Sequence, residues 1–200
     1  MGKHILTREK YVSRNIGKMS SMNNGKRTLK ESIMSNEVID ALEEWKYYNK
    51  SDCVLIGGVA LSYYIKPRYT QDVDFLFLSE TDIPDNVDKF KRFRKGAFRN
   101  NKTHVEVEVI SPETINTNKN TVKAVFDTAK IVDGVKVASP SGLVALKLGR
   151  FSYQDMADIQ ELYKFDLIDL SPYHLSDELI QRYIDFVQEI KNKENKKGTL

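Results

Sequence analysis

The chain has 200 residues, and 31 basic against 28 acidic side chains leave a formal net charge of +3, too even a balance for a chain that coats nucleic acid over its whole surface. Hydrophobic residues make up 40% and aromatic residues 10% of the sequence, which excludes wholesale disorder and allows one globular domain with an appendage or a small second lobe. The lone Cys53 excludes an internal disulfide framework and favours a cytoplasmic protein, and no apolar run is long enough to cross a membrane.

Residues 1–34 are predicted to form a basic N-terminal arm. Residues 1–30 contain eight basic groups and one acid, a charge of +7 that leaves −4 for the rest of the chain. Their few apolar residues follow no sustained period, which predicts a mobile or weakly helical segment. Such an arm is suited to bind RNA or DNA phosphates, and equally suited to solubilise the chain.

The first predicted helix covers residues 36–49, where apolar residues recur at spacings of three and four and Ser35 is placed to cap the first turn. The apolar run at 53–56 predicts a short buried strand. A pair of glycines at 57–58 ends this strand, and a helix is expected to follow over residues 59–65.

Two later segments, residues 72–78 and 104–110, alternate between apolar and charged side chains and therefore predict strands. Between them, a loop and a basic helix around residues 89–95 are expected. Residues 122–138 predict a β-hairpin, because an Asp-Gly pair inside this range is typical of a tight turn.

Apolar stripes at helical spacing predict three helices in the C-terminal part of the chain. Their expected ranges are 141–150, 153–163 and 175–190. The order of elements predicts an α/β (α+β) fold, with a mixed sheet flanked by helices over residues 35–138, a helical C-terminal lobe over 139–191 and a polar tail over 192–200.

Four acids stand out on the predicted strands. Asp72 and Asp74 share one strand face, since side chains alternate along a strand, and the apolar residues after them predict a buried strand. Two carboxylates there repel each other and lose hydration unless a cation joins them. Glu106 and Glu108 share one face of the later strand and offer a third carboxylate if the two strands are neighbours. Such acids are typical of a Mg²⁺ site that also binds substrate phosphates.

Gly57 and Gly58 lie between a predicted strand and the N-terminus of a helix, where backbone N–H groups can approach a phosphate. Thirteen residues separate Gly58 from Asp72, which is enough for one helix and a turn back to the neighbouring strand. We therefore expect the glycines and the acids to face one cleft.

These motifs resemble the DNA polymerase beta-like nucleotidyltransferase superfamily, and most closely its abortive-infection (Abi E type) toxin branch. That branch often shows Gly-Gly-x-Ala-Leu and then Arg-x-Thr-x-Asp-x-Asp. The matching positions here are Gly57, Gly58, Ala60, Leu61, Arg68, Thr70, Asp72 and Asp74. The branch also commonly places a Ser-Pro-x-x-Leu-x-x-x-Lys-Leu helix and an Asp-rich helix after the sheet, as in residues 139–165. The likeness covers roughly residues 37–165.

The resemblance implies Mg²⁺-dependent transfer of a nucleoside monophosphate from an NTP to an acceptor hydroxyl, with pyrophosphate leaving. It implies that Asp72 and Asp74 hold the metals, as two ions can stabilise the attacking and the leaving oxygen of an in-line displacement. The glycine pair would shape the phosphate loop. The third acid is Glu108 or Glu106, where the family more often has Asp. Glu108 is favoured, since a short apolar pair and a turn follow it.

Several other side chains have two interpretations each. Arg68 and Thr70 either clamp phosphate or ribose or close the turn before the second strand. Lys147 either neutralises triphosphate charge or is a solvated helical lysine. Asp155 and Asp158 share a helix face, where a helix cap or a surface ion pair is favoured over a ligand pair.

RNA, particularly a tRNA 3′ end, leads among the possible acceptors because of the basic arm, a basic patch and the toxin-like motif. The patch consists of Lys89, Lys91, Arg92, Arg94, Lys95 and Arg99. The toxin resemblance also implies a neutralising antitoxin protein. The alternatives are a small-molecule (antibiotic) nucleotidyltransferase and a binding or structural module that keeps the fold without catalysis.

Overall fold

The computed structural model describes residues 28–48, 52–67, 69–115 and 117–197. The predicted arm over residues 1–27 and the candidate ligand Arg68 lie outside the described residues.

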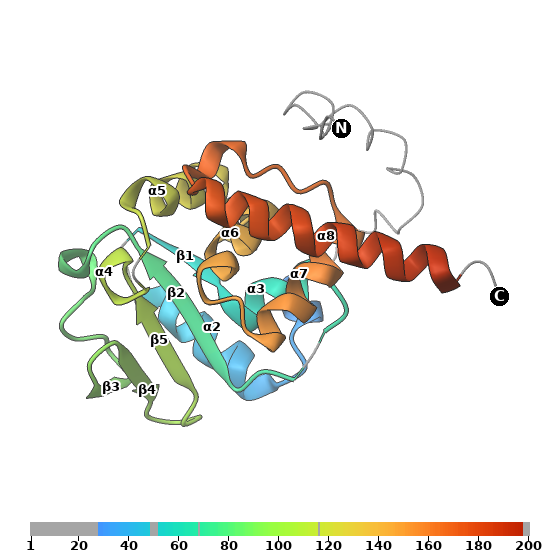
Figure 1. Ribbon diagram of the computed structural model, residues 1–200. Coiled ribbons are helices and arrows are strands. Elements are labelled where there is room, and N and C mark those ends of the chain that lie inside the picture. Colours follow the sequence, from blue (N-terminus) through green and yellow to red (C-terminus); the bar gives the residue numbers. More distant parts are fainter. Residues whose placement is uncertain (1–27, 49–51, 68, 116, 198–200) are drawn as a thin grey trace.

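A mixed β-sheet forms the centre of the fold (Figure 1). Its strands are β1 (Cys53–Ile56), β2 (Asp72–Phe77), β3 (Phe90–Arg94), β4 (Ala97–Asn100), β5 (Glu106–Ile110), β6 (Lys130–Val132) and β7 (Val135–Val137). They are ordered β3-β4-β5-β2-β1-β7-β6. β2 pairs antiparallel with β1 and parallel with β5. The predicted α/β fold with a mixed sheet is therefore confirmed.

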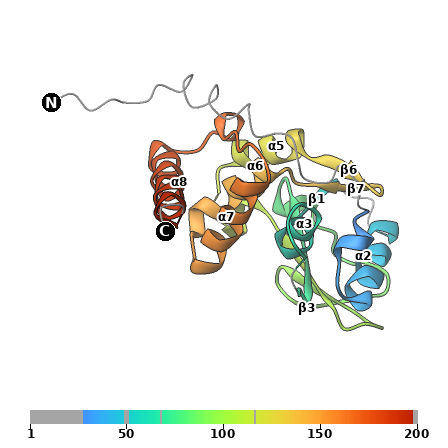
Figure 2. The same ribbon diagram turned by 90° about the vertical axis from the view of Figure 1, so that its right-hand side faces the viewer.

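Helices cover both faces of this sheet. They are α2 (Asn36–Tyr48), α3 (Gly57–Tyr64), α4 (Pro112–Ile115), α5 (Lys119–Thr128), α6 (Pro140–Arg150), α7 (Tyr153–Phe165) and α8 (Asp177–Lys197), with short 3₁₀ turns η2 (Lys30–Ser32), η3 (Glu80–Asp82) and η4 (Ser171–Tyr173). Figure 2 shows α2 on one side of the molecule and α7 and α8 on the other. The helix α8 continues to Lys197, so most of the predicted polar tail over 192–200 is helical.

The helix α2 packs on one sheet face through Trp45. The indole is fully buried, stacks on Phe75 with ring centroids 5.6 Å apart and meets Phe90 edge-on at 5.3 Å. The predicted cap is confirmed, since the Val38 N–H donates to Ser35 Oγ at 3.3 Å. Burial of these large rings leaves the opposite sheet face for the polar side chains.

The last residues of the predicted arm belong to the folded domain. Leu29 and Ile33 are buried in the core, and the Leu29 N–H donates to Asp133 Oδ2 at 2.8 Å. The prediction that the arm extends to residue 34 is therefore wrong at its C-terminal end. Leu29 and Ile33 are anchored because η2 between them presents both apolar side chains to the core.

The predicted basic helix at 89–95 is wrong, because this segment is the first strand of the β3–β4 hairpin. The turn between the strands contains Gly96, whose φ of +76° is a conformation that favours glycine. Phe90 and Phe98 are buried against Trp45 from this hairpin. Contact with a distant helix thus decides between strand and helix here.

The predicted hairpin over 122–138 is right only in its second half. β6 and β7 pair antiparallel, but residues 119–128 form α5, capped by Asn118, which accepts from the Asn120 N–H at 2.8 Å. The buried residues Val122, Val125 and Phe126 fall at helical spacing. The β-branched residues of this segment are typical of a strand, but the helical spacing of its buried residues predicts the observed structure better.

The predicted helix over 59–65 begins two residues earlier, since Gly57 and Gly58 open α3. Predicted helices at 141–150 and 153–163 are confirmed as α6 and α7. In the described part of the chain, no helix combines the length and apolar content that a membrane span requires.

Candidate active site

The parallel pairing of β2 with β5 brings the four predicted acids together. Asp72 lies opposite Glu106, and Asp74 lies opposite Glu108. Residues paired across neighbouring strands point to the same sheet face. All four carboxylates therefore lie on one face, at the ends where β2 and β5 begin.

The two glycines allow the backbone to approach Asp74 and Thr70 closely. Gly57 has a φ of +65°, and a Cβ added to it would lie 1.8 Å from Asp74 Oδ2. A Cβ on Gly58 would lie 2.8 Å from Thr70 Oγ1. The Gly58 N–H also donates to the carboxylate of Asp74. Glycine at 57 is thus required by both backbone conformation and space.

Asp74 is a carboxylate in an unfavourable electrostatic environment. Desolvation raises its pKa to about 7, and the charges of Asp72 and Glu108 act in the same direction. The hydrogen bond from Gly58 and the positive charge of Lys147 oppose this rise. A bound cation would relieve the repulsion that these acids exert on one another.

The third carboxylate is paired with a guanidinium. Arg94, reaching over from β3, donates a hydrogen bond to Glu108 and lies 3.6 Å from Glu106 Oε1. Within the ranges that the structure describes, no three His, Cys, Asp or Glu side chains form a ready-made metal-binding group. The third acid therefore lies on the same sheet face as the two aspartates, as expected. Its carboxylate, however, is hydrogen-bonded to Arg94 and does not join the aspartates in one cluster.

The donor set nevertheless fits a hard divalent cation. Asp72, Asp74 and Glu108 supply only carboxylate oxygens, which Mg²⁺ prefers, and Mg²⁺ commonly binds one or two carboxylates together with substrate phosphates. The raised pKa of Asp74 shows that Gly58 and Lys147 do not fully compensate its charge.

Thr70 closes the turn before β2. Its Oγ1 donates to Asp72 Oδ1 at 2.8 Å, which fixes the orientation of that carboxylate. For Thr70 this hydrogen bond agrees with the turn-closing interpretation, and Arg68 lies outside the described residues.

The side chain of Lys147 belongs to a buried ion-pair cluster and does not extend into solvent. Its Nζ lies 3.0 Å from Asp155 Oδ1 and 2.7 Å from Asp158 Oδ2, and both aspartates are buried. Arg150 Nε adds a contact of 2.7 Å to Asp155 Oδ2. The interpretations of a solvated lysine and a surface ion pair are both wrong, although the cap is confirmed, because Ser152 and Asp155 form a capping box.

This cluster borders the acids on the sheet. Burial acts to raise the pKa of Asp155, but hydrogen bonds from Arg150, Ser152 and Lys147 hold it below its usual range. The charge of Lys147 lowers the pKa of Asp74, and that of Asp74 raises the pKa of Arg150. The end of α6 and the start of α7 therefore place both positively and negatively charged side chains at the edge of the site. The shared helix face of Asp155 and Asp158 was predictable from their i,i+3 spacing, whereas their contacts with Lys147 and Arg150 depend on how α7 packs against α6.

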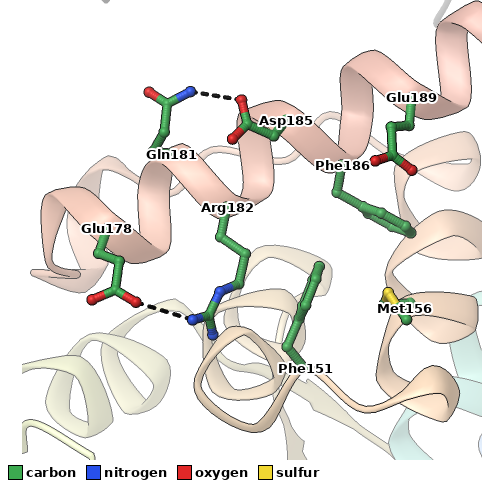
Figure 3. Close-up of a pocket in the computed structure, with 8 residues that line it drawn as sticks. All are labelled: Phe151, Met156, Glu178, Gln181, Arg182, Asp185, Phe186 and Glu189. Atoms are coloured by element: carbon green, nitrogen blue, oxygen red, sulfur yellow. Dashed lines mark hydrogen bonds and ion pairs between the residues drawn. The ribbon is translucent and has the colours of Figure 1, made fainter.

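The described surface includes hollows near the site and away from it. A cavity of about 510 Å³ lies between α8 and the turn from α6 to α7, where Phe151 lies beside Arg182 and Met156 lies near Phe186 (Figure 3). It contains none of the four sheet acids. A smaller groove of about 310 Å³ is lined by Gln71, Arg99 and Glu106, among others, and thus borders the acids directly.

Comparison with known families agrees with this geometry. Residues 40–137 match the family model for the nucleotidyl transferase AbiEii toxin of Type IV TA systems. The matched range runs from α2 to β7 and includes the glycine pair and all four sheet acids. No curated protein shows significant similarity to the chain. Over residues 40–137, just under half of its length, the chain is therefore similar to the AbiEii nucleotidyl transferase toxin family of Type IV toxin–antitoxin systems.

Proposed function

We propose that this nucleotidyltransferase moves a nucleoside monophosphate from an NTP to a hydroxyl of an RNA acceptor, such as a tRNA 3′ end, with Mg²⁺ held by Asp72, Asp74 and Glu108. The observation that carries the proposal is the placement of these carboxylates on one sheet face beside Gly57 and Gly58.

In this reaction the acceptor oxygen forms a bond to the α-phosphorus of the NTP, and the bond from that phosphorus to the bridging oxygen breaks as pyrophosphate leaves. Bound Mg²⁺ would polarise the phosphate and stabilise the charge that develops on the attacking and leaving oxygens. Asp72 and Asp74 would bind the Mg²⁺, and the hydrogen bond from Thr70 fixes the orientation of the Asp72 carboxylate. The glycine pair leaves the open backbone that a phosphate can approach.

Glu108 is the better candidate for the third acid. It pairs in register with Asp74 and raises the pKa of that group, whereas Glu106 lies opposite Asp72, closer to the groove at the sheet edge. Its side chain is 33% exposed, so an acceptor hydroxyl can reach it and transfer its proton to the carboxylate.

A macromolecular acceptor is favoured over an antibiotic by the charge around the site. The basic residues of the β3–β4 hairpin adjoin the acids, and the sequence of residues 1–30 carries a net charge of +7. The match of residues 40–137 to a Type IV toxin–antitoxin family supports a cognate antitoxin, and a single cysteine, Cys53, suits a reducing, cytoplasmic setting.

We expect label from one of the four NTPs to enter RNA when the protein is incubated with Mg²⁺, labelled NTP and total RNA. Asp72→Ala and Asp74→Ala should each reduce transfer by about 10³-fold or more, because loss of a metal ligand removes several kcal/mol of transition-state stabilisation. Asp85→Ala, an exposed acid outside the site, is the matched control. Transfer that persists in both Asp72→Ala and Asp74→Ala would contradict the proposed metal site. Transfer only to aminoglycoside-type hydroxyls would favour the antibiotic alternative.

Gly57→Ala should reduce transfer by about 10²-fold or more, since a displacement of about 1 Å at a reacting group costs that much. The new methyl group would occupy the position of the Asp74 carboxylate and strain a backbone at φ +65°. Gly149→Ala is the matched control, because a Cβ there meets nothing within 4 Å. Steady-state transfer and thermal unfolding would be measured for both variants. Full activity of Gly57→Ala would show that the position of Asp74 is not critical.

A further inference from the structure

We infer that the open face of the β3–β4 hairpin is a stacking platform for the unpaired 3′ segment of the RNA acceptor, with Phe93 as the base-stacking side chain. The inference rests on the proposed function, because it places the acceptor of that reaction. It assigns a partner and a role to a surface that the catalytic acids do not explain.

The polar face of the sheet continues from the acids onto the hairpin. Arg99 lies opposite Glu106, and Lys91 lies opposite Arg99. Cross-strand partners share a face, so both basic residues point to the same side as the acids. The opposite face is occupied by α2, where Trp45 contacts Phe90 and Phe98.

This part of the polar face is open in the described part of the chain. Lys91, Phe93 and Arg99 are exposed, with Phe93 at 38%. Figure 1 shows β3 and β4 projecting at one end of the sheet, away from α6, α7 and α8. A ligand that approaches the acids can therefore also reach this surface.

An irregularity in the strand places the aromatic ring. The register between β3 and β4 shifts between Arg92 and Arg94, so Phe93 is the extra residue of a bulge. Bulges commonly redirect a side chain. Two guanidinium groups lie near the Phe93 ring, with Arg99 Cζ at 4.3 Å and Arg94 Cζ at 5.4 Å from its centroid.

This arrangement has the chemistry of single-strand recognition. Aromatic rings stack on unpaired bases of any sequence, and neighbouring Lys and Arg side chains bind the backbone phosphates. Arg94 links the two regions, since it contacts Phe93 and also Glu108. A strand whose base stacks on Phe93 thus has its next nucleotides directed towards the acids.

Edge protection does not explain the surface. β3 is the edge strand of the sheet, and charged side chains on an edge strand prevent pairing with other chains. Edge protection therefore accounts for the lysine and arginine residues of β3. An exposed aromatic ring on the same edge has the opposite effect, because it adds an apolar contact surface.

The test measures binding separately from chemistry. Fluorescence anisotropy would follow a 5′-labelled single-stranded RNA of about 10 nucleotides, within the site size of single-strand platforms, in buffer without NTP and over a range of salt concentrations. We expect Phe93→Ala to weaken binding by roughly 5- to 100-fold without changing the salt dependence. Phe93→Trp should restore binding.

Charge variants give a different signature. Lys91→Gln combined with Arg99→Gln should lower the slope of log affinity against log salt by ~0.7 for each phosphate that the variant no longer neutralises. The matched controls are Phe165→Ala, an aromatic residue 45% exposed on α7, and Lys164→Gln, also exposed on α7. Both should leave binding unchanged. A blunt RNA duplex should be insensitive to Phe93→Ala, because its bases are already stacked.

Wild-type affinity in Phe93→Ala, or an equal loss in Phe165→Ala, would overturn the platform. If Phe93→Ala binds RNA as well as the wild type and Mg²⁺-dependent transfer to RNA persists, the platform is wrong and the proposed function stands. If RNA binding depends on Phe93 but no NTP is ever transferred to RNA, the proposed function fails instead.

Discussion

Asp74→Asn is expected to abolish nucleotidyl transfer and at the same time to stabilise the metal-free protein above neutral pH. Desolvation and the charges of Asp72 and Glu108 raise the pKa of Asp74 from 3.8 to about 7. The folded state therefore holds this proton more tightly than the unfolded state. The penalty for ionising Asp74 is absent below pH 3.8, grows as pH rises towards 7 and is complete above 7.

Asparagine removes that penalty and retains an oxygen that can accept the Gly58 N–H. At about 1.4 kcal/mol per pH unit of pKa difference, the gain in unfolding free energy at pH 8 should be about 2–4 kcal/mol. At pH 4 the gain should nearly vanish. Urea unfolding in EDTA at both pH values would measure it, with Asp85→Asn as the exposed control. Equal gains at both pH values, or none at pH 8, would show that Asp74 is not destabilised by its neighbours.

Lys147→Met should cause the largest loss of stability. The substitution keeps much of the side-chain volume but removes the cation between Asp155 and Asp158, which are 0% and 3% exposed. Removing one partner of a buried ion pair typically costs about 3–5 kcal/mol, because the remaining charge stays buried without compensation. Arg150 and the cap still bond Asp155, and the Gln154 amide still donates to Asp158 Oδ1 at 3.4 Å, so the loss should come from the missing positive charge and not from an unpartnered carboxylate.

Urea unfolding of Lys147→Met, Lys164→Met and the double variant Lys147→Met with Asp158→Asn tests this assignment. Lys164 is 42% exposed and pairs with Glu161, so its substitution should cost less than about 1 kcal/mol. The double variant should recover part of the loss. A cost below about 1 kcal/mol for Lys147→Met, or no recovery in the double variant, would contradict a structural ion-pair cluster.

The arrangement of the sheet acids and the glycine pair was predictable because it depends on local patterns. The alternation of apolar and charged side chains around Asp72 and Asp74 predicted that these two acids share a strand face. The same alternation in the later strand predicted a shared face for Glu106 and Glu108. Between Gly58 and Asp72, α3 runs to Tyr64 before the chain returns to β2, as the number of residues predicted. Only the adjacency of β2 and β5 had to be assumed, and the pairing register confirms it.

The rest of the site depends on contacts between distant segments, which no local pattern contains. Arg94 belongs to a segment whose basic residues give no strand signal, and its strand conformation depends on burial of Phe90 and Phe98 against Trp45. Lys147 looks like any helical lysine until the start of α7 places two aspartates beside it. Tertiary packing, rather than intrinsic propensity, decides both positions.

The most direct measurement is the anomalous diffraction of Mn²⁺ in crystals grown with a non-hydrolysable NTP analogue. We expect an anomalous peak within ligand distance of the carboxylates of Asp72 and Asp74, with the triphosphate over Gly57 and Gly58 and with Glu108 turned from Arg94 towards the ion. A bound nucleotide without Mn²⁺ at these aspartates, or Mn²⁺ bound only elsewhere on the protein, would contradict the assignment of the sheet acids as the metal site.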